Sequence, residues 1–529
     1  MVDAHEAPTT ERPERRLSVR ARERFDHLSA SERFRWWLVF GVLTVFAAVR
    51  AASSLERDPF WSTRAGVENL QGAPLVRADT WSWSAEGVWY PNSPGWNIVL
   101  GLGWQSLGYW GIFAAGFLAI TLLLGLALLL ARLAGARALP TLVGITPVLL
   151  VATSGFSPRA TVIVQCLIFT AVLFAWWWGG VAQRVRPSLS WLCVAAVGLI
   201  VSLVGNWMHV SFMFMAGAIA VMWALAWWSS PGIGVASRIA LIAGGTTGLL
   251  LGCVLSPYGM GLTLERSRVV DGVARGLVSE WMSVIDFVMH GEYQVIPIAI
   301  VALASVVGSA IWVTRLIRRG GRFDARTRLI LPLTVFSFLA VCAGLGTVRF
   351  LAVGLLAVLP VVGAAATEIF DSLRRRQQSG RGFWSRSKVV TYTSGRFLTV
   401  VILTVGLVVS PIAVPRIALG AQPAELGVAE RIPEGCLVWA KVGAAGPIIL
   451  ARPDVKVWID GRVDFYGRDL VVEYVQILSG HMPLPERAGC VVLPSPEREH
   501  FPLADALDND PVWERTAELD GFVLWVRQD

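Results

Sequence analysis

The sequence predicts a polytopic membrane protein, mainly α-helical with about 11 transmembrane helices, that carries a small C-terminal α/β domain. Of the 529 residues, 54% are hydrophobic and only 16% are charged, whereas soluble domains average about 25% charged residues. Apolar stretches of about 20 residues, long enough to cross a bilayer, recur as far as residue 414. This composition excludes a soluble enzyme, a disordered chain and a small disulfide-stabilised scaffold.

The chain divides into three parts. Residues 1–35 form an Arg-rich tail that we expect to be cytoplasmic and without regular structure, and no cleavable signal peptide is expected before the first span. Residues 36–414 form the membrane domain, with two long outer loops at 53–108 and 256–293. The expected spans are 36–52, 109–131, 138–154, 160–180, 190–206, 208–228, 238–255, 294–314, 329–347, 350–366 and 397–414.

Basic residues orient these spans. With the N-terminus in the cytoplasm, the inner segments up to residue 414 hold 26 Arg and Lys residues and the outer loops hold nine, which is the asymmetry typical of cytoplasmic loops. Eleven spans then place the C-terminal domain outside, in a multi-pass plasma (inner) membrane protein. The net charge of +8 follows from this topology, so no nucleic-acid partner is expected, and the membrane lipids are.

The first outer loop carries an acid in an apolar, Trp-rich setting. An anion beside the membrane is costly unless it is used or paired, so Asp79 is either a functional residue or the ion-pair partner of Arg77. The tryptophans that follow it, among them Trp89 and Trp96, fit an aromatic belt at headgroup level. Residues 97–107 are apolar but too short to span, and we expect an interfacial helix there.

Further polar residues fall on the same side of the membrane. Glu280 and Trp281 lie in the second outer loop, where they either bind a sugar ring by stacking and hydrogen bonding or belong to the surface. Tyr258 lies in a Pro-Tyr-Gly turn that ends a helix. Asn206 and His209 share the turn between the fifth and sixth spans.

Two outer arginines stand at helix ends. Arg159 lies between the third and fourth spans, and Arg349 between the ninth and tenth. An isolated arginine in such a place is commonly an anchor that reaches the membrane surface, an interpretation that suits Arg159 well.

Residues 415–529 alternate short apolar runs with polar segments, which predicts an extracytoplasmic α/β domain. Strands are expected at 436–440, 447–450, 455–459, 490–493 and 522–526, and helices at 467–478 and 502–509. Cys436 and Cys490 each begin a strand, so they could form a disulfide if those strands are neighbours. Asp460 and Arg462 follow the third strand, where they either bind a ligand or form a turn in which Arg462 pairs with Asp464.

The order of these motifs resembles a known superfamily. An outer-loop Asp, paired tryptophans, an Asn-x-x-His-like turn, Pro-Tyr-Gly, Glu-Trp and a final Asp460-Gly-Arg-x-Asp-x-Tyr-Gly467 resemble the polytopic GT-C glycosyltransferases, which use lipid-phosphate sugars. The resemblance covers most of residues 36–480. It implies that Asp79 is the catalytic base and that Arg159 and Arg349 bind the leaving phosphate. The substrate-binding residues that it implies are Trp89, Asn92, Trp96, Asn206, His209, Tyr258, Glu280, Trp281, Asp460 and Arg462.

Two hypotheses of function follow. In the first, the chain transfers a sugar from a polyprenyl-phosphate donor to a glycan or glycolipid acceptor of the cell envelope. It needs no cofactor, and a divalent metal is possible but not indicated, since no Cys/His metal spacing, P-loop or dinucleotide fingerprint occurs. In the second, it is a non-catalytic polyprenyl-lipid- or glycan-binding or scaffold protein of envelope assembly, which the absence of an acid from residues 92–96 favours.

Overall fold

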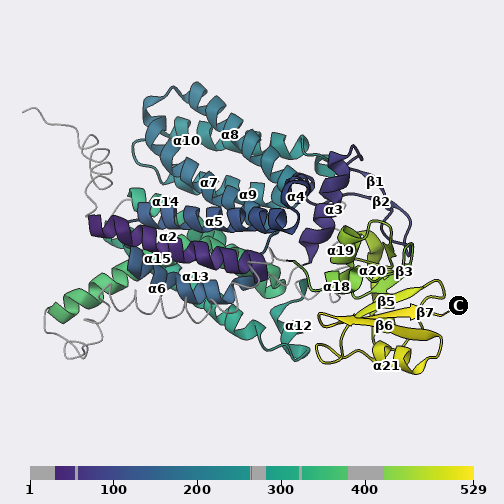
Figure 1. Cartoon of the computed structure of the whole chain (residues 1–529). Coiled ribbons are helices and arrows are strands. Elements are labelled where there is room, and N and C mark those ends of the chain that lie inside the picture. Colours follow the sequence, from purple (N-terminus) through teal and green to yellow (C-terminus); the bar gives the residue numbers. More distant parts are fainter. Residues whose placement is uncertain are drawn as a thin grey trace, which may run out of the picture.

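A computed structural model describes residues 30–53, 57–261, 264, 281–320, 324–378 and 422–528. In this part of the chain a bundle of apolar helices carries an α/β domain at one end (Figure 1). The expected fold class, a multi-pass helical membrane protein with a small C-terminal α/β domain, is confirmed. The eleventh expected span, Glu280 and most of the Arg-rich tail lie outside the described residues.

Ten of the expected spans coincide with helices. Eight of the described helices are long and apolar enough to cross a membrane, while α6 and α9 are shorter, so the described residues do not confirm the count of eleven. The helices of the bundle are α2 (Ala30–Ser53), α5 (Tyr109–Leu133), α6 (Ala138–Val151), α7 (Ala160–Val181), α8 (Pro187–Met208), α9 (Phe212–Trp228), α10 (Val235–Val254), α13 (Val295–Gly320), α14 (Ala325–Gly346) and α15 (Arg349–Gln378).

Helices α8 and α10 pack closely because α10 presents glycines at every fourth position. A Cβ atom at Gly248 would lie 2.0 Å from the carbonyl oxygen of Ala195, and one at Gly252 would lie 2.5 Å from the Cβ of Ser202. Lipid tails are as apolar as the side chains, so helices in a bilayer associate through close packing, which small residues permit. The glycines at 244, 248 and 252 therefore determine how near these two helices approach.

The first outer loop is largely ordered into helices. It contains α3 (Asp58–Leu70), the short hairpin of β1 (Arg77–Ala78) and β2 (Val88–Trp89), and α4 (Pro94–Leu107), which includes the expected interfacial helix. Pro59 stands in the first turn of α3, where its missing N–H costs nothing. Helices α3 and α4 cross at Gly66 and Gly101, where a Cβ atom on Gly66 would lie 1.8 Å from the carbonyl oxygen of Asn97.

The C-terminal domain is built on a five-stranded sheet of order β4-β3-β5-β7-β6. Strands β3 and β4 and strands β3 and β5 run parallel, and the other two pairs are antiparallel. The strands are β3 (Leu437–Ala440), β4 (Lys456–Val457), β5 (Cys490–Pro494), β6 (Trp513–Leu519) and β7 (Phe522–Arg527). The helices are α18 (Leu426–Ala429), α19 (Val442–Ala451), α20 (Val463–Leu478) and α21 (Pro502–Asn509).

One expectation for this domain is wrong, and one strand was not predicted. The strand expected at 447–450 is the end of helix α19, whose residues from Ala444 to Leu450 are all buried; a short apolar run has no periodicity that separates a strand from a buried helix. Strand β6 was not expected, because it is an edge strand with mainly exposed, polar residues.

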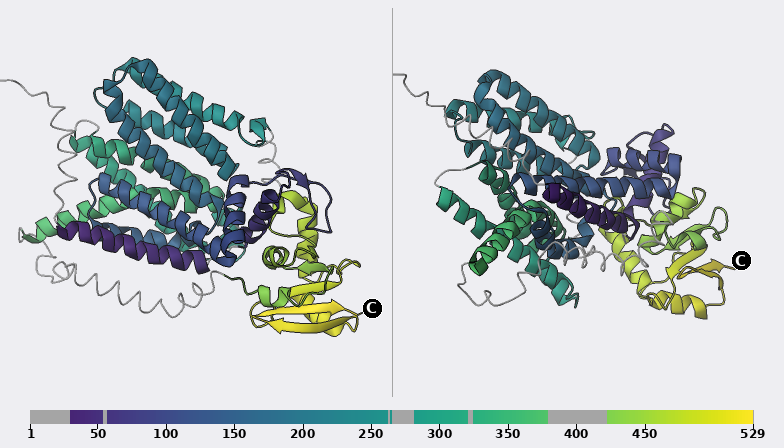
Figure 2. Two further views of the ribbon diagram at one scale, coloured as in Figure 1. Left: turned by 45° about the horizontal axis from the view of Figure 1, so that its top comes forward. Right: turned by 60° about the vertical axis from the view of Figure 1, so that its left-hand side comes forward.

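The first outer loop extends the sheet of the C-terminal domain. The backbone N–H of Val457 in β4 donates to the carbonyl oxygen of Trp81 at 2.9 Å, and the N–H of Trp83 donates to the carbonyl oxygen of Val457 at 3.1 Å. The edge of the sheet is thus paired by a segment that lies more than 370 residues earlier in the chain. Both views in Figure 2 show the domain at the end of the bundle where α3 lies.

The close packing of α8 on α10 can be tested at one glycine. We expect Gly248→Ala to lower stability by about 1–3 kcal/mol, the usual cost of overpacking, because its Cβ would clash with the backbone at Ala195. Thermal unfolding in detergent measures the change. Gly217→Ala in α9 is the control, since a Cβ there meets nothing within 4 Å, and a loss as large in the control would contradict this account.

The structure contains a disulfide between Cys436, which directly precedes β3, and Cys490, which begins the neighbouring strand β5. Because disulfides persist only in oxidising compartments, this bond also tests the expected orientation. We expect alkylation of unreduced protein from cells to modify Cys166, Cys193, Cys253 and Cys342 after denaturation, and to leave Cys436 and Cys490 unmodified. Modification of all six would place the domain in a reducing compartment.

Candidate active-site cavity

A cavity of about 430 Å³ lies where the bundle meets the C-terminal domain. Its wall combines helix ends from the bundle, both outer loops and the start of α20. Seven of the residues expected from the sequence line it: Asn92, Trp96, Arg159, His209, Tyr258, Trp281 and Arg349. These residues are far apart in the chain and meet because each lies at or near the end of a helix.

Five expected site residues do not line this cavity: Asp79, Trp89, Asn206, Asp460 and Arg462. Asn206 instead packs between helices, where its side-chain amide donates to the carbonyl oxygen of Ser202 at 2.8 Å. Trp89 is buried against Trp61 and Trp81, with ring centroids 5.9 and 5.1 Å away.

Two arginines give the cavity a positive side. Arg159 precedes α7 and forms an ion pair of 2.5 Å with Asp58. Arg349 begins α15, and its guanidinium lies 5.4 Å from the ring centroid of Trp281. Helix N-termini carry partial positive charge and exposed N–H groups, so the starts of α7 and α15 add to the positive potential of these side chains.

Two carboxylates lie in the same cavity, and sequence reasoning did not assign either to it. Asp58 begins α3, and the indole N–H of Trp61 donates to its Oδ1 at 3.1 Å. Asp464 comes from the first turn of α20 in the C-terminal domain. Asp58 had a recognisable signal, because it is among the first acids after the first span.

His209 is held in one tautomer by its neighbour. Its Nδ1 accepts the backbone N–H of Ser211 at 3.2 Å and lies 2.7 Å from the Ser211 hydroxyl. A nitrogen that accepts a backbone N–H carries no proton, so the neutral ring has its proton on Nε2. His209 is therefore a hydrogen-bond donor through Nε2.

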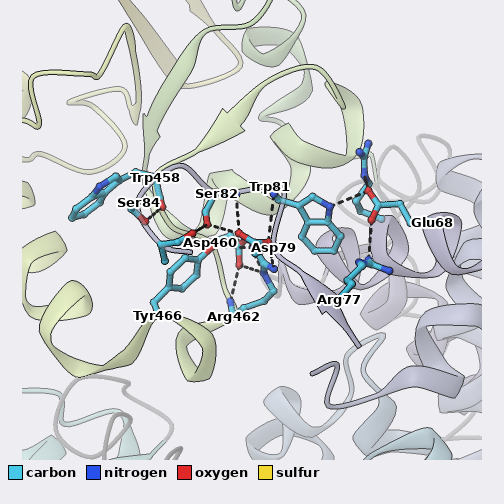
Figure 3. Close-up of polar contacts among 12 residues, drawn as sticks. Glu68, Arg77, Asp79, Trp81, Ser82, Ser84, Trp458, Asp460, Arg462 and Tyr466 are labelled. Atoms are coloured by element: carbon cyan, nitrogen blue, oxygen red, sulfur yellow. Dashed lines mark hydrogen bonds and ion pairs between the residues drawn. The ribbon is translucent and has the colours of Figure 1, made fainter. Parts of the chain in front are cut away.

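Asp79 lies in a separate, buried cluster between the first outer loop and the C-terminal domain (Figure 3). Its Oδ1 accepts from Nη1 of Arg462 at 2.6 Å, and its Oδ2 accepts the backbone N–H of Ser82 at 3.0 Å and the Ser82 hydroxyl. The side chains of Asp79 and Arg462 are each 1% exposed. Asp460 completes the cluster on the other side of the guanidinium.

Both pairings that the sequence suggested here are wrong. Arg77, the expected partner of Asp79, forms its ion pair with Glu68 at 2.9 Å. Arg462 pairs with Asp460 and Asp79 instead of Asp464. Asp464 lines the cavity.

The cluster keeps Asp79 charged. Burial alone would raise the pKa of Asp79, but the charge of Arg462 and the hydrogen bonds from Arg462 and Ser82 outweigh it and hold that pKa below its ordinary value. Burial and the neighbouring Asp460 raise the pKa of the Tyr466 hydroxyl far above its ordinary value, so it stays protonated and donates to Asp460 at 2.9 Å.

No group of three or more His, Cys, Asp or Glu side chains that could hold a metal ion is found in the described part of the chain. The chemistry available to the cavity from its own side chains is anion binding by Arg159 and Arg349, and proton transfer by Asp58 or Asp464.

The lowered pKa of Asp79 predicts how stability depends on pH. A depressed carboxylate pKa adds stability above the unfolded value of about 4, and that stability is lost as pH falls through the lower folded value. The free energy of unfolding of wild type should therefore exceed that of Asp79→Asn by about 3–5 kcal/mol near neutral pH, which is the usual cost of breaking a buried pair. This difference in stability should disappear below about pH 4. Denaturant unfolding of both proteins from neutral pH to acid measures it, and a gap that widens in acid would contradict the prediction.

Comparisons with known proteins give structural likenesses only. No protein-family model matches the chain, and no curated protein matches it. Among solved structures, ArnT from Cupriavidus metallidurans bound to undecaprenyl phosphate is similar at 13% identity over 92% of this chain and 97% of that chain, with a TM-score of 0.47. The oligosaccharyltransferase of Archaeoglobus fulgidus, tethered to an acceptor peptide, is similar at 13% identity over 85% and 68%, with a TM-score of 0.32.

Proposed function

We propose that this chain transfers a sugar from a polyprenyl-phosphate donor to a glycan or glycolipid acceptor on the outer face of the plasma membrane. The observation that carries the proposal is the meeting of Arg159 and Arg349 with the carboxylates Asp58 and Asp464 in one cavity at the end of the membrane bundle. Such a cavity offers an anion site and a proton acceptor together. Its volume of about 430 Å³ lies within the range of small-molecule sites.

The arginines suit the phosphate of the donor. Arginine binds phosphate oxygens through charge-assisted, often bidentate hydrogen bonds, and both side chains stand at helix ends where a membrane-anchored phosphate would lie. An apolar polyprenyl chain needs no binding groups beyond the lipid-facing surface of the bundle. The aromatic side chains of Tyr258 and Trp281 line the cavity and suit the stacking of a sugar ring.

Asp58 is the proposed general base. Asp58 pairs with Arg159, and a phosphate that binds Arg159 competes for the same guanidinium. Loss of that pairing leaves a carboxylate oxygen of Asp58 able to contact the acceptor hydroxyl. Asp58 then takes the proton of the acceptor hydroxyl, whose oxygen bonds to the anomeric carbon while the bond from that carbon to the phosphate oxygen breaks. The products are the glycosylated acceptor and polyprenyl phosphate.

The placement of helix ends supports the proposed orientation. The residues that precede α7, α9 and α15 and those that follow α8 and α10 meet at the cavity, and these are the segments that the basic-residue asymmetry assigns to the outside. The catalytic role predicted for Asp79 stays a prediction, and the assay below tests it beside Asp58.

A second candidate function is non-catalytic binding of a polyprenyl lipid or glycan. The observation that favours it is that the carboxylates of Asp58 and Asp79 each form an ion pair with an arginine, so that both already have a partner within the protein.

A transfer assay in lipid nanodiscs, with mass spectrometry of envelope lipids from matched strains, tests the proposal. We expect Asp58→Asn to lower kcat by about 10²–10⁴-fold, the usual contribution of a general base, and polyprenyl-phosphate sugar to accumulate in the strain. Arg349→Gln should weaken polyprenyl-phosphate binding by about tenfold or more. Glu518→Gln, on the exposed edge strand β6, is the control.

The outcomes separate the candidates. Full activity of Asp58→Asn with loss of activity in Asp79→Asn would support the Asp79 prediction and overturn the role of Asp58. Tight binding of polyprenyl phosphate without transfer by the wild type would favour the binding function.

A further inference from the structure

We infer that Asp79 and Arg462 form a clamp that positions the two cavity carboxylates, so that Arg462 is a positioning residue of a site it does not line. The clamp is defined as the Asp79–Arg462 ion pair together with the rings of Trp81 and Trp89 around the guanidinium. The inference rests on the proposed function where it concerns catalysis, and on geometry alone where it concerns position.

One half of the clamp is built within the C-terminal domain. The Nε and Nη2 atoms of Arg462 donate to Asp460 at 2.9 and 2.7 Å, and Nη2 also donates to the hydroxyl of Tyr466 at 3.0 Å. Asp460, three residues after the end of the parallel strand β4, and Tyr466, in the first turns of α20, therefore hold the guanidinium rigidly. Nη1 remains directed across the domain boundary to Asp79.

The other half is a socket in the first outer loop. Trp81 and Trp89 place their ring centroids 4.4 and 4.9 Å from the guanidinium carbon of Arg462, distances that give a favourable cation–π interaction. The β1–β2 hairpin orients the socket, because the backbone N–H of Asp79 donates to the carbonyl oxygen of Gly87 at 2.9 Å. Figure 3 shows Arg462 beside Asp79 and Asp460.

The socket is fastened in turn to α3, the helix that carries Asp58. Glu68 near the end of α3 accepts the indole N–H of Trp81 at 2.9 Å and pairs with Arg77 at 2.9 Å. A continuous set of charged and hydrogen-bonded groups therefore joins α3 to α20. The two elements at its ends supply the two cavity carboxylates, Asp58 and Asp464.

Gly461 links the clamp to the cavity through the backbone. It directly precedes Arg462, lines the cavity, and lies so close to α3 that a Cβ atom there would be 2.9 Å from Oδ1 of Asp58 and 2.9 Å from Nε1 of Trp61. A shift of Arg462 in its socket moves this backbone against the Asp58 carboxylate. Misplacement of a reacting group by about 1 Å can cost a hundredfold in rate.

The clamp should therefore affect turnover and leave lipid binding unchanged. Arg159, which directly precedes α7, and Arg349, which begins α15, are the proposed phosphate ligands, and neither belongs to the clamp. Asp58 and Asp464 depend on the docked domain. The expected signature is a lower kcat with an unchanged affinity for polyprenyl phosphate.

Asp79→Asn is the variant of choice, because it removes the charge across the boundary and leaves the Arg462–Asp460 pair intact. Replacing Arg462 would leave Asp460, which is 0% exposed, without its counter-charge. Gly461→Ala perturbs Asp58 with the clamp in place, and Glu518→Gln is the control in the same domain. The full-length protein in nanodiscs is used throughout.

Three measurements are made on each variant. Amide hydrogen exchange at residues 79–89 and 457–467 reports docking. Carbodiimide labelling of Asp58 and Asp464 reports the position of the carboxylates without any need for activity. Kinetics of transfer are compared with polyprenyl-phosphate affinity from native mass spectrometry.

For Asp79→Asn we expect at least tenfold faster exchange in both segments, faster labelling of Asp58 and Asp464, a kcat lowered at least tenfold and an affinity within twofold of wild type. Gly461→Ala should alter only labelling of Asp58 and kcat, with wild-type exchange. Wild-type exchange or wild-type labelling in Asp79→Asn overturns the clamp whether or not the wild-type protein transfers a sugar. If wild type shows no transfer while exchange and labelling respond as expected, the proposed function fails and the clamp stands.

Discussion

The burial of the Arg462 charge is the constraint on which the outer half of the structure depends. Taking an ion out of water costs several kcal/mol even after relaxation, and here the guanidinium and two carboxylates are all at most 1% exposed. The cost is offset only when every donor and acceptor is satisfied. Asp460 and Tyr466 accept some of the hydrogen bonds that the Arg462 guanidinium donates, and Asp79 accepts another. The loop and the C-terminal domain each leave a buried charge without its full set of partners unless they are in contact.

The bundle obeys a different rule. Within the bilayer no hydrophobic gain distinguishes helix–helix from helix–lipid contact, and close approach of backbones takes its place. The glycines of α10 provide that approach against α8, while the outward faces keep residues such as Leu250 and Leu251 exposed for lipid. Close packing of backbones thus holds the helices together within the membrane, whereas buried ion pairs hold the loop and the C-terminal domain together outside it.

Much of this organisation could be predicted from the sequence, and the failures have physical causes. Apolar length alone located ten helices, since a bilayer imposes one length on every span. The sidedness of Asn92, His209, Tyr258 and Arg349 followed from alternation of the spans, and these residues do meet in one cavity.

The pairing of Asp79 with Arg462 joins residues 383 positions apart and leaves no local pattern, so the nearer Arg77 was the natural partner to expect. Asp58 stands directly before a proline in the first turn of a helix, which is the ordinary composition of a helix start and does not mark a cavity residue. The end of α19 was mistaken for a strand because every one of its side chains there is buried, which removes the polar face that marks a helix.

The pairing of Trp81–Ser84 with β4 has a consequence for how the protein is made. The loop segment is synthesised long before strand β4, with which it pairs. Nine further helices of the described bundle are synthesised between the two. The cavity gains Gly461 and Asp464 only after nearly the whole chain has emerged. The complete site can therefore form only after nearly all of the chain has been synthesised and inserted. A truncated chain would have an incomplete pocket at the membrane surface.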